Sequence, residues 1–311
     1  MRVASNSLSN ALIDQLGRLT ARQNRLQQQA ASGQRVHLPE DDPASVRRAL
    51  DLQAKGAGLA QYQRNMSSLK DQANASYQAI RSLKNISDRA REIAILADGT
   101  RSPTEIAAYA DELNQLIRQG VQSVNQKFDG SYLFGGTRNG QAPFVLAADS
   151  DGRTTGVAYQ GNSSTAEVEI AEGATLSSQT LGANPSGAGP RGLITDPRAG
   201  ADFFNHLIAL QTHLAAGDTA AIAADDQPRL GADEENFLCH FARLGATLKR
   251  LDTASAAATQ QAESVRSRLS GEVDADLPQT LVQLNQTQLA YQAALQSAAR
   301  LLGQSLLDYL N

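Results

Sequence analysis

Apolar and small side chains recur at a regular spacing over the last part of the chain, from Asp276 to Asn311. The steps between them alternate four and three residues, which is the spacing of a coiled-coil seam. Asp276 and Pro278 have the residue types of a helix N-cap and a first helical turn. The pattern therefore predicts a long amphipathic helix whose seam includes Leu281, Leu284, Tyr291, Leu295, Leu302 and Leu306.

The first thirty residues carry a similar stripe, made of Leu8, Leu12, Leu16, Leu19 and Leu26. Both ends of the chain are poor in charge, since Arg300 is the only charged residue from 278 to 307 and Asp14 the only one from 3 to 17. A solvated helix usually carries acids and bases on its polar face. We therefore predict that the two terminal helices pack together and form a self-assembly seam enclosed between chains. A buried helix of one large globular domain is the alternative.

Between the ends, the same four–three spacing continues through a very long segment, roughly 44–98, and predicts supercoiled helix packing. Further helices are predicted at about 104–127, 202–217 and 232–269. Gly33, Pro39 and Pro43 separate the first helix from the long one. Around them we expect a structured turn held by helix caps and charge pairs, with Arg35 opposite the acidic run 40–42, in preference to a metal site.

Composition changes abruptly at Asp129, where glycine-rich sequence and alternating apolar residues begin. Residues 143–182 have the pattern of short strands, and NPSGAGPRG at 184–192 has the composition of a mobile loop. We expect this segment to be separable, so that a short linker could replace 137–194 and leave the helices folded.

The predicted fold is mainly α: a long coiled-coil-like helical bundle, formed by the N- and C-terminal halves, with a small inserted β domain. The predicted domains are a terminal coiled-coil domain (1–33 with 277–311), a helical trunk (34–130 with 200–276) and an outer β domain (131–199).

The chemistry-bearing residues give no reason to expect an enzyme. We find no catalytic constellation, no cofactor motif and no metal-ligand spacing. His206 and His213 lie on one helical face without a third ligand, so solvated histidines are expected. Cys239, the single cysteine, is expected to act as a small hydrophobe in a helix. No apolar run approaches the roughly 18 residues of a membrane span, and the opening segment lacks the apolar core of a secretory signal.

Four segments resemble the flagellin-like family: ASGQRVHLPEDDPAS at 31–45, GSYLFGGT followed by APF at 142–144, GATLKRLD at 245–252, and SLLDYL at 305–310. The GSYLFGGT and SLLDYL segments favour the family's hook–filament junction members over filament flagellins. The likeness covers nearly the whole chain.

The resemblance implies a structural protein of the bacterial flagellum that acts as an adaptor at the hook–filament junction. It implies terminal helices that form an inner coiled coil, a shell of trunk helices and an outward β module. It also implies extracellular location after export without a cleaved signal peptide. The implied partners are identical subunits in a ring, the other hook-associated junction protein, flagellin and an export chaperone at the C-terminal region.

Three alternatives remain at this point. A filament flagellin would polymerise alone into long filaments, whereas a junction protein would stop at a short collar. An enzyme would need a reactive constellation in the β module or the acidic turn. A nucleic-acid-binding coiled coil is disfavoured by the net charge of -4 and by the lack of a basic stripe beyond Arg18, Arg22 and Arg25.

Overall fold

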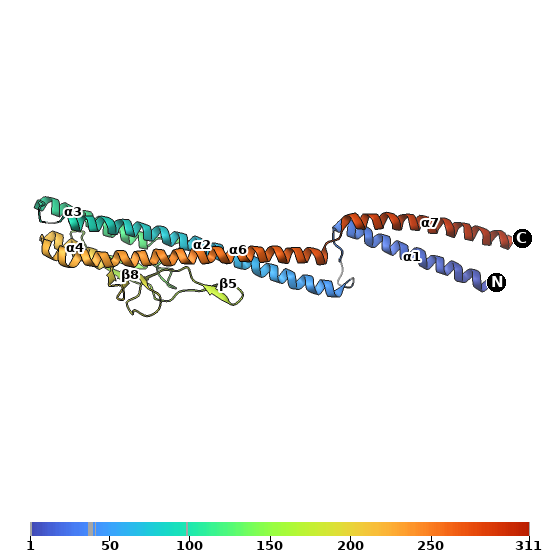
Figure 1. Ribbon diagram of the computed structural model, residues 1–311, viewed down its shortest axis with the longest axis horizontal. Helices are drawn as coiled ribbons and strands as arrows, with labels where there is room; N and C mark the ends of the chain where they lie inside the picture. The colour runs from blue at the N-terminus through green and yellow to red at the C-terminus, as the bar shows by residue number, and fades with distance from the viewer. Residues whose placement is uncertain (1, 37–39, 41, 98, 311) are drawn as a thin grey trace. The chain divides into compact units, whose positions relative to one another are not determined.

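The structure is a computed structural model that describes residues 2–36, 40, 42–97 and 99–310, with side chains described for residues 10–300 within these ranges. The chain forms two compact units, one made of residues 1–60 and 260–311 and the other of residues 61–259. Long helices dominate both, so the predicted mainly α fold with a small β insertion is confirmed (Figure 1). The helices are α1 (Arg2–Ser32), α2 (Pro43–Leu96), α3 (Pro103–Val124), α4 (Phe203–Ala216), α5 (Thr219–Ala221), the π-helix η1 (Ile222–Asp226), α6 (Gln227–Val273) and α7 (Leu277–Leu310).

Helix ends follow from local sequence. Gly33 ends α1 with a positive φ of 70°, and its amide donates to the carbonyl oxygen of Gln29. Ser102 and Glu105 form a capping box at the start of α3, where each side chain bonds the other residue's amide. Gly217 ends α4 in the left-handed conformation. These residues therefore set the lengths of the helices without help from distant contacts.

In the unit formed by both chain ends, α1 and α7 lie side by side and run antiparallel (Figure 1). Neither helix could stay folded in water alone, because an isolated amphipathic helix has nowhere to bury its apolar stripe. Leu26 of α1 is buried, and Thr280 and Thr287 of α7 are buried as well. The pair thus buries a narrow strip, part of which is polar.

In the second unit, the predicted seam of α2 is confirmed. All its members from Met66 to Ala97 are buried, including two serines: Met66, Leu69, Ala73, Ser76, Ile80, Leu83, Ser87, Ala90, Ala94 and Ala97. The apolar members from Ala73 onward share one core with α3, α4 and α6, to which Leu113, Leu207 and Phe237 contribute. Met66 and Leu69 belong to a second cluster with Ile170, Leu251 and Ala258. Both clusters form because the helices carry apolar stripes of matching period.

The described residues of this unit also form short strands: β1 (Lys127–Phe128), β2 (Ser131–Tyr132), β3 (Phe144–Ala148), β4 (Thr154–Tyr159), β5 (Val168–Ala171), β6 (Ala174–Leu176), β7 (Leu181–Ala183), β8 (Gly192–Asp196) and β9 (Ala201–Asp202). Successive strands from β1 to β6 form three antiparallel pairs. The last three form one sheet, in which β8 pairs parallel with β7 and antiparallel with β9.

The strands share the helical core, which contradicts the expectation that residues 137–194 are separable. Phe144, Leu193 and Ile194 are buried in the same cluster as the helix side chains. Removing them would expose apolar surface of α2, α3 and α4 to water. The change of composition at Asp129 marks a change of secondary structure. The hydrophobic core contains side chains from both sides of that boundary.

The glycine-rich segment 184–192 is also more organised than its composition predicted. The buried Asn184 side chain donates to the carbonyl oxygens of Ala188 and Pro190, each at 2.6 Å. Arg198 donates to the carbonyl oxygen of Gly189 at 2.9 Å. A buried amide that satisfies two loop carbonyls fixes the course of the loop.

Candidate assembly surface

The connection between α1 and α2 is tied to the connection between α6 and α7. The Arg35 guanidinium donates to the Ser45 hydroxyl at 3.2 Å and to the carbonyl oxygen of Glu272 at 2.7 Å, and it lies 3.6 Å from Asp42. Backbone bonds join Arg35 to Val273 and Ala275 to Gly33. The predicted turn with caps and charge pairs is confirmed for its described residues, while Asp41 and residues 37–39 lie outside them.

Carboxylates in this connection are held ionised by their hydrogen bonds. Asp42 accepts the hydroxyl and the amide of Ser45, and these bonds, with Arg35 nearby, lower the pKa of the Asp42 carboxyl. Two hydrogen bonds of 2.9 Å from Arg48 lower the pKa of Glu272. Both sites are solvated, so their role is to fix the geometry of the chain reversal more than to stabilise it.

The predicted stripe of α1 lies along the contact with α7. Leu12, Leu16 and Leu19 are half-buried and Leu26 is buried, whereas Ile13 on another face is 65% exposed. The side chain of Leu8 lies outside the described residues. The described part of the stripe thus packs within one chain.

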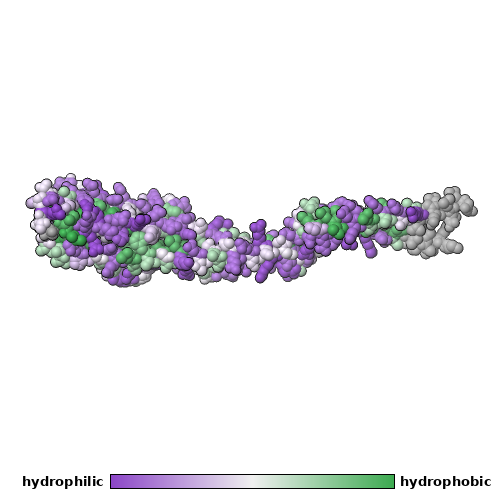
Figure 2. Space-filling view, turned by 45° about the horizontal axis from the view of Figure 1, so that its top comes forward, coloured by the Kyte–Doolittle hydropathy of each residue, from purple (hydrophilic) through white to green (hydrophobic). Residues whose placement is uncertain are grey.

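On α7 the predicted seam coincides only in part with the face that α1 covers. The face toward α1 carries Thr280 and Thr287, both buried, and the half-buried Leu284 and Tyr291. Apolar side chains elsewhere on α7 remain in solvent. Leu277, Leu281 (50% exposed) and Leu295 (43% exposed) adjoin the covered face, whereas Val282 and Leu289 (66% exposed) lie on the opposite side of the helix. Figure 2 shows hydrophobic surface gathered over α1 and α7. We call Leu277, Leu281 and Leu295 the exposed face of α7. The side chains of Leu302 and Leu306 lie outside the described residues.

An exposed apolar stripe of this kind is unusual on a single soluble chain. Scattered surface leucines are normal, but a contiguous apolar patch marks an interaction site. At about 100° per residue, Leu281 and Leu295 share one side of α7 and adjoin Leu277. Because the stripe follows a coiled-coil spacing, its geometry suits another helix.

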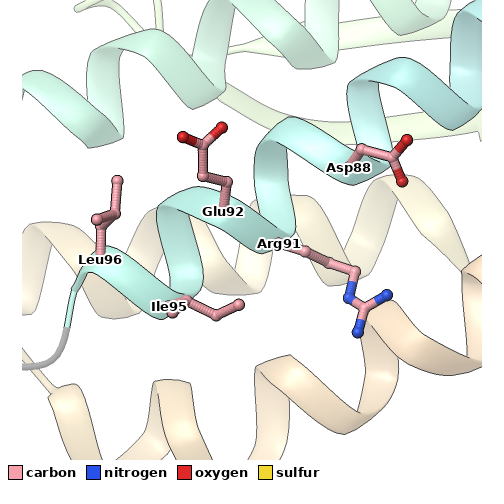
Figure 3. Close-up of a pocket in the computed structure, with 5 residues that line it drawn as sticks. All are labelled: Asp88, Arg91, Glu92, Ile95 and Leu96. Atoms are coloured by element: carbon pink, nitrogen blue, oxygen red, sulfur yellow. The ribbon is translucent and has the colours of Figure 1, made fainter.

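Elsewhere the described structure has a pocket of about 490 Å³, lined by side chains of α3, of α4 and of the turns beside them, among them Ile106, Ala110 and Leu214. A pocket of about 280 Å³ on α2 is lined by Asp88, Arg91, Glu92, Ile95 and Leu96, and in Figure 3 Glu92 and Arg91 point in different directions. Its charged groups are engaged elsewhere: Asp88 with Lys84, Glu92 with Arg89, and Arg91 with Glu234. Among the described residues, no His, Cys, Asp and Glu side chains form a metal-binding group, and no helix is long and apolar enough to cross a membrane.

The expectation of solvated histidines is wrong. His206 is half-buried with its Nδ1 atom 2.7 Å from the Asp233 carboxylate, and His213 lies 2.7 Å from Asp226 in the same way. Sequence reasoning missed these partners because they lie on other elements, although the two aspartates repeat the histidines' spacing of seven.

The prediction for Cys239 is also wrong, because this side chain is not packed as a hydrophobe. It lies exposed on α6, and its sulfur accepts a hydrogen bond from Arg191 at 3.4 Å.

Comparison with known proteins agrees with this architecture. The model of the bacterial flagellin N-terminal helical region matches residues 3–139. Flagellar hook-associated protein 3 of Salmonella typhimurium is 24% identical to this chain over 98% of each. The chain resembles flagellar hook-associated protein 3. The similarity spans both chain ends and the β region, so it is not limited to the helical region shared with flagellin.

Solved structures share the fold. A flagellar hook-associated protein of Vibrio parahaemolyticus has a TM-score of 0.64 and 21% identity, covering 75% of this chain and all of that one. The flagellar junction protein FlgL of Legionella pneumophila has a TM-score of 0.55 and 14% identity, covering 73% of this chain and 99% of that one. At these identities the comparison supports the arrangement of helices and strands.

Proposed function

We propose that this chain is a structural protein of the bacterial flagellum, an adaptor at the hook–filament junction that assembles through α1 and α7. The observation that carries the proposal is the exposed face of α7, which one chain leaves uncovered. The likeness to flagellar hook-associated protein 3 over nearly the whole chain favours this role over that of a filament flagellin.

Burial energetics support assembly through this face. Leu277, Leu281 and Leu295 are 42%, 50% and 43% exposed in the single chain. Covering apolar surface contributes about 25 cal/mol per Å², so a row of such side chains can stabilise association between copies. The terminal helices form the inner domain of the assembly in this proposal, with the trunk around them and the β region outermost. The assembly seam comprises Leu8, Leu12, Leu16, Leu19 and Leu26 on α1, and Leu281, Leu284, Tyr291, Leu295, Leu302 and Leu306 on α7.

The partners in the proposal are other copies of the chain, the other hook-associated junction protein, flagellin and an export chaperone that binds the C-terminal region. The protein is extracellular, within the flagellum, and reaches it without a cleaved signal. It has no enzymatic activity and no cofactor. These statements rest on the resemblance to flagellar hook-associated protein 3.

The test is Leu295→Asp in the full chain, expressed in a strain that lacks the wild-type protein. Leu295 is exposed in the single chain, so we expect the purified variant to melt within a few degrees of the parent. In the assembly the carboxylate would lose its hydration, which costs several kcal/mol when no partner is present. Motility should therefore be lost, with flagellin released into the medium and hooks that carry no filament.

Ser297→Asp is the matched control. Ser297 is exposed and lies two residues from Leu295, which places it about 200° away around α7. The variant therefore carries the same charge at nearly the same position along the helix but on another side. We expect this variant to swim. Swimming by Leu295→Asp would exclude its face as an assembly surface. A large drop in its melting temperature would show that Leu295 belongs to the core of the single chain.

A further inference from the structure

Three buried polar side chains recur on α6 and the turn before it with a spacing of seven: Asp226, Asp233 and His240. Each meets a polar group of another segment. Asp226 and Asp233 lie 2.7 Å from His213 and His206 of α4, and the Nε2 atom of His240 lies 3.1 Å from the carbonyl oxygen of Gly192 in β8. We call these three contacts the polar ladder.

The polar ladder occupies one of the two inward positions of a regular seam. The other position is apolar and buried throughout, at Leu230, Phe237, Leu244, Leu251 and Ala258. The two sets together give steps of four and three, from Asp226 through Leu230, Asp233 and Phe237 to His240. In coiled coils a polar residue at one inward position selects register at a cost in stability.

Burial makes the two carboxylates costly. Desolvation raises the pKa of both Asp226 and Asp233, and the histidine partner opposes that rise in each case. The Oδ1 atom of Asp226 accepts no hydrogen bond from the described residues, whereas Asp233 also accepts the Asp202 amide at 3.0 Å. A buried charge pair is often no more stabilising than apolar residues of the same size, while a buried charge left alone is strongly destabilising.

Only one axial position of α4 satisfies both pairs. Moving α4 by seven residues in one direction would put His213 beside Asp233 and His206 beside His240. Moving it by seven in the other would put His206 beside Asp226 and leave Asp233 alone. The apolar positions repeat with the same spacing, so they discriminate less between these registers.

We infer that the polar ladder is a register lock that holds α4 in a single axial position on α6, at the expense of stability. Because α4 follows β9 directly and Asp233 binds the amide of Asp202, the lock also sets where the β8–β9 sheet lies on α6. Breaking one partner leaves a buried charge. Replacing both aspartates and both histidines by leucine removes the desolvation cost of the buried polar groups. It also removes their preference for one register of α4.

The experiment measures register in the full chain. Cys239→Ser removes the native thiol, and spin labels on Thr212→Cys and Glu235→Cys, both exposed, report the distance between α4 and α6. The parent should give one narrow distance distribution. His213→Leu alone should melt about 10 °C lower, since it strands Asp226. Leucine at His206, His213, Asp226 and Asp233 together should restore the melting temperature and add a second distance population, because a seven-residue shift moves a helix by about 10 Å.

One narrow distance in the fourfold leucine variant would overturn the inference, as would parental melting of His213→Leu. A swapped variant, His213→Asp with Asp226→His, covers the case in which the fourfold variant does not fold. The swap keeps the pair with its ends exchanged and should retain the parental distance. A broadened distribution in the swapped variant would also contradict a lock based on the Asp–His hydrogen bonds.

Discussion

The helix pair α1–α7 and the core of residues 61–259 use the same hydrophobic spacing with opposite results. In the core, Ile80, Leu113 and Phe237 have no exposed surface, because helices and strands surround them on all sides. In the pair, Leu281 and Leu289 keep half or more of their surface in water. Two helices can bury one strip between them, whereas several helices and a sheet can enclose a side chain on all sides.

The difference separates two uses of a coiled-coil pattern. A seam that is satisfied within the chain stabilises the fold, and a seam left partly open is available to other chains. The low charge of α7 is consistent with the second use, because charged side chains beside the exposed leucines would oppose burial. Substitutions in the core should therefore mainly change the stability of the fold, whereas substitutions at the exposed leucines of α7 should mainly change association between chains.

The largest effect is expected for Phe237→Ala in the core. This side chain is fully buried and meets Phe203 edge-on, with ring centroids 5.0 Å apart. Its loss should lower the free energy of unfolding by about 3–5 kcal/mol, measured by urea denaturation. The neighbouring Leu238 is half exposed, so Leu238→Ala is the control and should change stability little. Equal losses in the two variants would mean that this part of α6 is not packed as described.

A second effect is expected from acid. Burial lowers the pKa of His240 to about 4, so between its ordinary value of about 6.5 and about 4 the unfolded chain binds a proton that the folded chain does not. Stability should therefore fall over that window as the pH is lowered, by about 3 kcal/mol at its lower end. The comparison is with His240→Gln, which does not titrate.

The difference between parent and His240→Gln isolates this group from other acid effects. Asp196, whose pKa is lowered to about 2 by its bonds with Arg198, contributes stability that is lost below its unfolded value, and it does so in both proteins. Parallel pH profiles for the parent and the variant would show that His240 is not held neutral by burial.

The smallest effect is expected in the terminal pair, for Leu26→Ala. Leu26 is the buried member of the α1 stripe, but the open pair can adjust around a smaller side chain. The opening free energy of α1 should fall by about 2 kcal/mol, read from amide hydrogen exchange. Ile13→Ala, at an exposed position of the same helix, should leave exchange unchanged. A large loss of protection in α2 and α6 with Leu26→Ala would show that the core depends on the terminal pair.

Much of this architecture could be predicted from the sequence. The four–three spacing predicted the long helix α2 and its supercoiled packing, because the period of a buried helix face depends only on local geometry. Gly33 and Gly217 ended their helices as expected, since positive φ is a property of single residues. The sequence predicted a turn between α1 and α2 that is held by caps and charge pairs. It did not predict that Arg35 of this turn also binds Glu272, which is distant in the sequence.

The sequence by itself determined the elements and which residues of each could face inward. Only the tertiary structure decided the neighbours: the aspartates beside His206 and His213, the strands that share the helical core, and the face of α7 that α1 leaves open. The physical reason is that periodicity is fixed by a few consecutive residues. Burial and pairing depend on which distant segment the chain brings alongside, and that choice minimises the free energy of the whole fold.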